Sequence, residues 1–242
     1  MSVTTTDGTA LQDKNVFIHS NPDLVLEAIA TIEVPSAVTG HKPSYTKRPV
    51  SIHVNKETCL STHEYGAVLK SMLRGKFRES SQTKISLPED SSIAVELALR
   101  IFSTEDATLA KLPAYLFKVS AEELWQLPAF CDKYDFNFKD KKLKLWFEKW
   151  YELNAAAVMK IDDERDIHKG YRMLLWPCWF YDHAVGFAAA TRYLVYKSTS
   201  AIEAFQPKWF GKLKLHPESV SEIRMPYNIM RKYKKSINLT KI

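Results

Sequence analysis

The stretch Lys84–Phe102, which reads KISLPEDSSIAVELALRIF, predicts a short strand followed at once by a buried helix. Apolar and polar residues alternate from Lys84 to Pro88, which is typical of a half-buried strand that ends at a proline. From Ile93 to Phe102 the polar side chains are Glu96 and Arg100, whose spacing allows them to pair on one narrow exposed stripe. Because a helix that is apolar on nearly all sides is usually buried, we expect this one at the centre of a domain.

The segments before this stretch predict further strands and one short helix. Residues Asp23–Ile32 are apolar and fit either a strand or a short helix, and Val34–Pro49 reads as a long loop or a hairpin. Val50–Val54 alternates as a half-buried strand does. Tyr65–Leu73 has its apolar residues at helical spacing.

The segments after it predict helices. Ser120 and Glu123 form a capping box, and Pro128 should kink or shorten the helix that this box starts. Two later helices are expected at about His168–Trp176 and from Asp182 to Lys197. Between them and the capping box lies a strongly amphipathic helix, whose apolar face comprises Leu143, Trp146, Phe147, Trp150 and Tyr151. Strands come early and helices late, so the sequence predicts the α+β class.

The charge of the chain is concentrated near its C-terminus. The net charge is +6 over 242 residues, whereas Lys208–Ile242 alone contains nine Lys or Arg and two Asp or Glu. The densest basic positions in this segment are Arg231, Lys232, Lys234 and Lys235. Such a patch fits a nuclear-localisation or nucleic-acid-binding segment, but the solvated face of a terminal helix is the simpler interpretation, because short basic runs are common.

Motifs for catalysis are missing from the sequence. It contains no P-loop, nucleophile elbow or metalloprotease signature, and the Cys59–His63 pair has no second pair nearby to complete a metal site. Cys178 stands in an apolar run that favours an inert buried thiol. Asp182 is expected to cap a helix rather than to act with His183 as an acid–base pair. We therefore predict a protein that is not an enzyme and has neither metal nor cofactor.

Three features bear on location. The chain has three cysteines, a polar N-terminal stretch without a secretory h-region, and no apolar run of about 20 residues that could span a bilayer. We therefore expect an intracellular protein, cytoplasmic or nuclear, that does not cross a membrane.

Several short stretches resemble the BTB/POZ domain, and most of all its fungal members. They are Val68–Leu73, Phe77–Glu79, Ile85–Asp90, the helix Ile93–Phe102 and the later stretches Ser120–Phe136 and Leu143–Trp150. The fungal proteins also carry a helical extension similar to Tyr171–Ser198 and a final segment similar to Pro217–Arg231, so the resemblance covers most of Val50–Ser236.

The resemblance implies a BTB/POZ-like small sheet with a helical cluster, followed by a packed C-terminal helical extension. The predicted organisation is a disordered leader over 1–14, a BTB/POZ-like domain over 15–155 with an inserted loop at 34–49, and a helical extension with a basic tail over 156–242.

The family also implies function, namely a non-catalytic adaptor or scaffold that binds a protein partner. Many members form homodimers, and some recruit substrates to a cullin-type ubiquitin ligase. The dimer-side candidates in this chain are Tyr65, Val68, Leu69 and Met72, for which core packing is the competing interpretation. The cullin-side candidates are Phe102, Glu105 and Asp106, and for the two acidic residues the competing interpretation is a solvated loop. The alternative function is a nucleic-acid-associated regulator that uses the basic tail, and an enzyme of unknown class ranks third.

Overall fold

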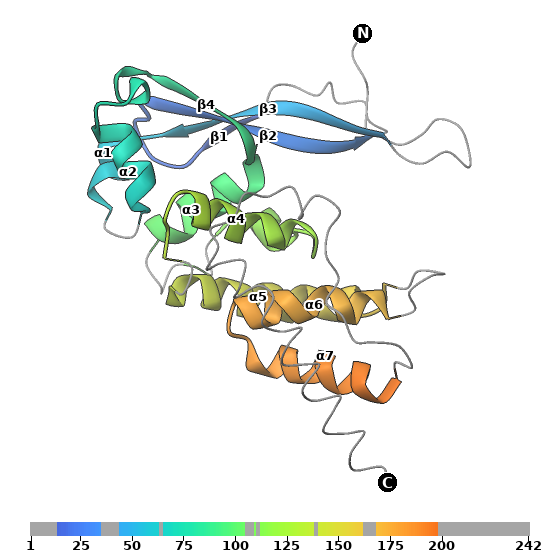
Figure 1. The fold of residues 1–242 in the computed structure, drawn as a ribbon. Helices are drawn as coiled ribbons and strands as arrows, with labels where there is room; N and C mark the ends of the chain where they lie inside the picture. Colours follow the sequence, from blue (N-terminus) through green and yellow to red (C-terminus); the bar gives the residue numbers. More distant parts are fainter. Residues whose placement is uncertain are drawn as a thin grey trace. The chain divides into compact units, whose positions relative to one another are not determined.

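The computed structural model describes most of the chain before residue 198, and this part falls into two compact units (Figure 1). The sheet unit contains Met1–Ser103 and Tyr134–Phe136, and the helical unit contains Thr104–Lys133 and Asn137–Ile242. The residues described within these units are 14–34, 44–62, 65–104, 109, 112–137, 140–161 and 168–197. The predicted leader over 1–14 lies outside the described residues except for residue 14. The predicted domain boundary at residue 155 stays a prediction.

The sheet unit is built on a four-stranded mixed sheet in the order β1-β3-β2-β4. Its strands are β1 (Asn15–Phe17), β2 (Leu24–Val34), β3 (Ser44–Val54) and β4 (Lys84–Ser91). Strands β2 and β3 are antiparallel, whereas β1 is parallel to β3 and β4 is parallel to β2. The stretch Asp23–Ile32 is therefore largely strand, and the hairpin interpretation of Val34–Pro49 holds for residues 44–49, which extend β3.

One face of the sheet is apolar because its register aligns the buried positions of neighbouring strands. Leu26 lies opposite Ile52, and Ala28 lies opposite Val50. All four side chains are buried, as alternation predicts for a sheet with one covered face. Pairing of β4 with β2 shifts register directly after Leu87, so Pro88, which has no backbone N–H, falls where the regular ladder is interrupted on an edge strand.

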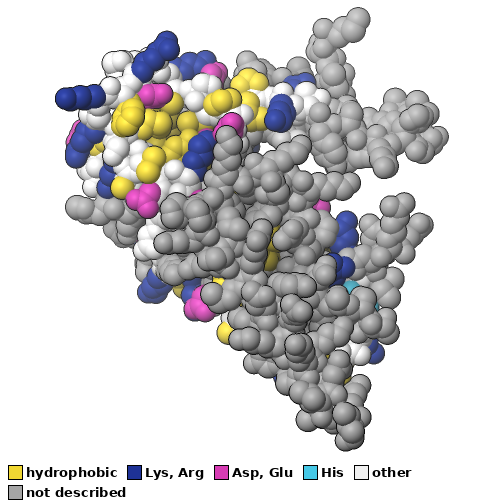
Figure 2. All heavy atoms as spheres, viewed as in Figure 1, with side chains coloured by type: hydrophobic (Ala, Val, Ile, Leu, Met, Phe, Trp, Pro, Cys, Tyr) yellow, Lys and Arg dark blue, Asp and Glu magenta, His cyan; other side chains and the backbone are white. Residues whose placement is uncertain are grey.

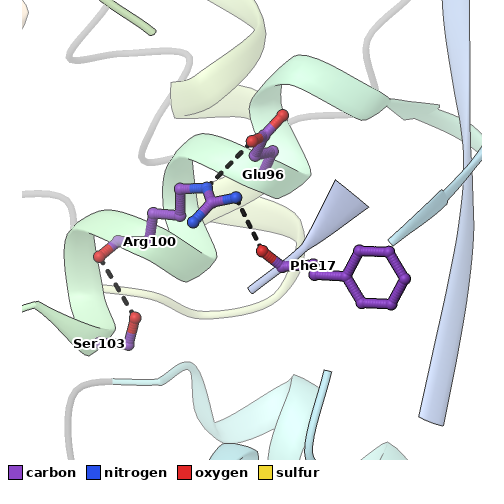
Figure 3. Close-up of polar contacts among 4 residues, drawn as sticks. All are labelled: Phe17, Glu96, Arg100 and Ser103. Carbon is purple, nitrogen blue, oxygen red and sulfur yellow. Dashed lines mark hydrogen bonds and ion pairs between the residues drawn. The ribbon is translucent and has the colours of Figure 1, made fainter. Parts of the chain in front are cut away.

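Helix α3 (Ser92–Ser103) contacts strands β2, β3 and β4. Nearly every residue from Ala94 to Phe102 is buried, which confirms the predicted central helix. The expectation of an exposed polar stripe is wrong, however, because Glu96 is only 2% exposed. Arg100 Nε donates to Glu96 Oε1 at 3.0 Å, and Arg100 Nη2 donates to the Phe17 carbonyl of β1 at 2.8 Å (Figure 3). The two side chains pair as predicted, but toward β1 rather than on a solvated stripe.

Two short helices lie at one end of the sheet, α1 (Lys56–Ser61) and α2 (Ala67–Arg74), followed by the 3-10 turn η1 (Arg78–Ser81) (Figure 1). Gly66 precedes α2 against the chain at Tyr134. A Cβ at Gly66 would lie 1.9 Å from the Tyr134 carbonyl oxygen, so this contact requires glycine. The Tyr134 hydroxyl donates to Asp90 Oδ2 at 2.8 Å, which joins 134–136 to the end of β4.

The helical unit contains two 3-10 turns and four helices among the residues that are described. These are η3 (Ala114–Phe117), η4 (Glu123–Trp125), α4 (Gln126–Lys133), α5 (Lys141–Val158), α6 (Lys169–Phe180) and α7 (Ala184–Lys197). The capping box is confirmed, since the Ser120 amide donates to Glu123 Oε2 and the Glu123 amide donates to Ser120 Oγ. Pro128 lies in the first turn of α4, so the short helix expected from this proline is confirmed.

Tryptophans form much of the core of this unit. The rings of Trp125 and Trp176 stack with centroids 3.9 Å apart, and Trp150 Nε1 donates to the Val119 carbonyl at 2.8 Å. Trp146 is also buried, on the same apolar face of α5 as Trp150. Helices α5 and α6 are in contact, as are α6 and α7. The chain is thus of the α+β class, with a four-stranded mixed sheet and helices followed by packed C-terminal helices.

The charge pair on α3 gives the first prediction. Replacing Arg100 by Met removes the positive charge beside the buried Glu96 carboxylate and the donor to the Phe17 carbonyl. We expect the free energy of unfolding to fall by about 3 kcal/mol, because a buried charge loses its compensating partner. Chemical denaturation followed by circular dichroism measures the change.

The matched control is Lys149→Met. Lys149 pairs with Glu152 at 3.0 Å, but the two side chains are 51% and 66% exposed. Breaking this solvated pair should cost less than about 1 kcal/mol. Equal losses in the two variants would contradict a structural role specific to the buried pair.

Candidate functional site

The four dimer-side candidates separate into core and surface residues. Tyr65 and Leu69 are 2% and 1% exposed, and the Tyr65 hydroxyl donates to the Leu99 carbonyl of α3 at 2.9 Å. These two residues are therefore core residues and do not present a surface to a partner. Val68 is 47% exposed and Met72 is half-buried. Only the latter two remain candidates for contact with a partner.

Val68 is the first of a row of exposed residues along α2. This row was not predicted from the sequence. Val68, Ser71 and Gly75 follow one another at helical spacings of three and four, and all three are exposed. A Cβ at Gly75 would lie 3.1 Å from Cδ2 of Phe77, so the Phe77 ring lies against this glycine, and Phe77 is itself 59% exposed. We call Val68, Ser71, Met72, Gly75 and Phe77 the α2 stripe.

Basic side chains border the α2 stripe. Between Tyr65 and Arg78 the sequence contains four Lys or Arg and no Asp or Glu. Arg74, Lys76 and Arg78 are exposed, and Lys70 is half-buried. In the view of Figure 2, hydrophobic side chains gather chiefly over the end of the sheet that Figure 1 places beside α1 and α2, with Lys and Arg side chains around them. The α2 stripe thus combines an apolar centre with a basic border.

The segment that carries Phe77 is held by hydrogen bonds. The Gly75 amide donates to the Ser71 carbonyl at 2.8 Å, which closes α2, and the Ser80 amide donates to the Phe77 carbonyl at 3.1 Å. The Lys56 ammonium of α1 donates to the Ser80 carbonyl. The backbone on both sides of Phe77 is therefore fixed, and its ring is exposed from an ordered turn.

The cullin-side candidates do not form a surface in the described structure. Phe102 is 1% exposed and its ring packs on Phe136 with centroids 5.0 Å apart, so it belongs to the core. The assignment of Phe102 as a contact residue is corrected accordingly. Glu105 and Asp106 lie outside the described residues. So do the basic positions Arg231, Lys232, Lys234 and Lys235.

The thiols are buried away from solvent. Cys59, Cys131 and Cys178 are each 1% exposed or less, which confirms the buried setting predicted for Cys178. Burial raises the pKa of the Cys59 thiol to about 12, with the nearby Asp23 adding to the effect, and burial also raises the pKa of Cys131 and Cys178. A thiol that stays protonated is a poor nucleophile.

His183, rather than Asp182, takes the capping position before α7. His183 Nδ1 accepts a hydrogen bond from the Gly186 amide at 3.1 Å, whereas Asp182 pairs with Lys144 at 2.8 Å. The prediction of an Asp182 cap is wrong, because Asp182 has a positive φ of 52° and ends the turn after α6. Among the described residues, no group of three or more His, Cys, Asp or Glu side chains is placed to hold a metal ion.

Comparison with known proteins adds no relative, since no protein-family model and no curated protein matches the sequence. In the part of the chain that the structure describes, no helix is both long and apolar enough to cross a membrane. Support for the candidate site therefore comes from the geometry of the sheet unit alone.

Thiol labelling tests the buried cysteines. We expect a maleimide reagent to react negligibly with Cys59, Cys131 and Cys178 in the folded protein and with all three in denaturant, because each is buried and protonated. Mass spectrometry counts the adducts over time. Rapid labelling of one cysteine in the native protein would indicate an accessible nucleophile and contradict this description.

The environment of His19 leads to a prediction of how the free energy of unfolding depends on pH. Its Nδ1 accepts from the Asn55 amide at 3.1 Å, and its Nε2 lies 3.3 Å from the Tyr65 hydroxyl. Burial lowers the pKa of His19, and the positive charge of Arg100 lowers it further. As the pH falls below the ordinary histidine pKa of about 6.5, His19 binds a proton more readily in the unfolded chain than in the folded chain. The free energy of unfolding is therefore highest above this pH and decreases below it.

Denaturation between about pH 7.5 and about pH 5.5 measures this dependence. We expect the wild-type protein to lose stability across this range and His19→Gln to lose less, since glutamine does not titrate. His183, whose pKa is also lowered by burial, leaves part of the slope in the variant. Identical slopes in the two proteins would show that His19 does not couple protonation to folding.

Proposed function

We propose that this chain is a non-catalytic protein–protein interaction module of the BTB/POZ type, an adaptor or scaffold that binds a protein partner through the α2 stripe. The observation that carries the proposal is the exposure of Val68 and Phe77 on an ordered helix and turn. The α+β sheet unit with its buried helix α3 supports the family assignment, because the resemblance implied a small sheet with a helical cluster.

The composition of the α2 stripe supports binding. Protein interfaces commonly have an apolar centre and a polar border, and arginine is enriched in them. Val68 and Phe77 supply apolar surface, while Arg74 and Arg78 supply guanidinium groups beside it. Isolated exposed apolar residues are normal on proteins, whereas neighbouring exposed apolar side chains mark a contact surface. Here Val68 on α2 and Phe77 on the turn after it are both exposed, and Met72 of α2 is half-buried.

Two kinds of partner follow from the resemblance, namely a second copy of the chain or a cullin scaffold. A scaffold partner would link this protein to substrate recruitment by a ubiquitin ligase. The alternative of a nucleic-acid-associated regulator depends on the charge of Lys208–Ile242, and predicts binding that weakens steeply with salt.

Light scattering of the full chain tests the proposed function, alone and with the N-terminal region of a cullin. We expect either a dimer or a complex with the cullin region. Replacing both Val68 and Phe77 by Ala should weaken the complex at least about tenfold, because central apolar contacts carry much of the binding energy. The two side chains are exposed, so the folded monomer should keep its stability and its circular dichroism spectrum.

The matched control is Leu153→Ala, which removes an apolar side chain that is 58% exposed on α5 of the helical unit. This control should leave complex formation within about twofold of the wild-type protein, because Leu153 lies outside the α2 stripe. A chain that stays monomeric in every mixture contradicts the proposed function. A complex that Leu153→Ala weakens as much as the double variant contradicts its assignment to α2.

A further inference from the structure

We infer that the α2 stripe takes a partner segment that carries both apolar side chains and carboxylates, and that it does not take a second copy of itself. This inference rests on the proposed function and narrows it to one class of partner. Two properties of the stripe carry it, the spacing of its apolar side chains and the sign of the charges that border it.

The apolar spacing fits a helical partner. Val68 and Gly75, against which the Phe77 ring lies, are seven residues apart on α2, or about 10 Å along the helix axis. Ser71, between them, has a small side chain and lets a partner approach the helix closely. A partner helix with apolar residues two turns apart would reach both ends of the stripe, and a third apolar residue between them would lie over Ser71.

The charges select the chemistry of that partner. Lys70 and Arg74 are one helical turn apart, and Lys76 and Arg78 lie on either side of Phe77. Because no Asp or Glu occurs between Tyr65 and Arg78, this segment carries a charge of +4 with no internal compensation. Carboxylates on the partner would face basic side chains that flank the apolar contact, a complementarity that favours both affinity and association rate.

The same charges disfavour a symmetric contact of α2 with α2. In a two-fold interface each subunit presents the same surface, so the four basic residues of both copies would be brought to one interface that has no Asp or Glu from this segment to offset them. Like charges brought together in this way oppose association. The α2 stripe is therefore a surface for a different, acidic segment.

The basic C-terminal segment is a second place where an acidic peptide could bind. A test must therefore distinguish binding at this segment from binding at the α2 stripe. Lys208–Ile242 contains nine basic and two acidic residues and could attract a negatively charged probe without any apolar contact. The two sites differ in one respect, since binding at the α2 stripe requires Val68 and Phe77 as well as charge. Variants that remove apolar side chains and variants that remove charges therefore distinguish the sites.

Three designed amphipathic peptides of about 18 residues serve as probes, each with the same leucine face and with Glu, Gln or Lys at the flanking positions. Fluorescence anisotropy with the full chain measures their Kd values. We expect the Glu peptide to bind at least about tenfold more tightly than the Gln peptide, and the Lys peptide to bind most weakly. Raising the salt concentration should reduce the difference in Kd between the Glu and Gln peptides, because salt screens interactions between exposed charges.

Variants locate the binding. Val68→Ala with Phe77→Ala should weaken the Glu and Gln peptides alike, by about tenfold, since it removes the shared apolar contact. Arg74→Gln with Arg78→Gln should weaken the Glu peptide and leave the Gln peptide within about twofold. The control in the C-terminal segment, Arg231→Gln with Lys232→Gln, should leave all three affinities within about twofold, because these residues are not part of the α2 stripe.

Each failure has its own meaning. Equal affinities for the Glu and Gln peptides, or loss of Glu-peptide binding only in the C-terminal control, overturn the inference while the proposed interaction function stands. A wild-type dimer that dissociates on Val68→Ala with Phe77→Ala also overturns it, because the occupant would then be a second copy. Absence of binding to every peptide, with a monomeric chain in the cullin mixtures, overturns both proposals.

Discussion

The Glu96 carboxylate of α3 lies in the core of the sheet unit, and Arg100 connects it to the backbone of β1. A carboxylate that is 2% exposed needs a nearby positive charge, and a guanidinium that donates in two directions supplies it. The Arg100 side chain links the short strand β1, which has only three residues, to a helix that itself contacts β2, β3 and β4. The edge of the sheet and its central helix are therefore coupled by a polar contact inside an apolar layer.

A core arranged in this way determines which side of α2 stays at the surface. Tyr65 reaches the Leu99 carbonyl of α3, and Leu69 and Leu73 follow it into the core at four-residue intervals. Val68 and Ser71 then necessarily lie on the other side of the helix, beside the basic residues. The α2 stripe is thus a consequence of how α2 packs on the sheet unit. The packed sheet unit already holds the residues of the stripe in place. Binding a partner therefore costs less conformational entropy than it would for a disordered segment.

Local patterns predicted much of this structure, and long-range contacts account for the rest. The capping box at Ser120 and the apolar face of α5 depend on residues a few positions apart, so the sequence alone was enough to predict them. Strand β1 was missed because it is short and pairs with β3, 36 residues away in the register. The burial of Glu96 depends on where the Phe17 carbonyl lies, which spacing does not reveal. At the candidate site, Tyr65, Leu69 and Phe102 were assigned to partner surfaces by their position in the resemblance, and the sequence alone did not decide between surface and core for them. The exposure of Phe77 depends on the turn after α2, which periodicity does not describe.

Amide hydrogen exchange, measured on the full chain alone and with the Glu peptide, tests whether a buried α3 supports an α2 surface that binds an acidic partner. We expect the amides of α3 to exchange slowest within the sheet unit, because the interior residues of this helix are almost all buried. We expect the peptide to slow exchange chiefly between Ala67 and Ser81. Fast exchange in α3, or protection by the peptide that falls elsewhere in the chain, would contradict a buried α3 that presents α2 to an acidic partner.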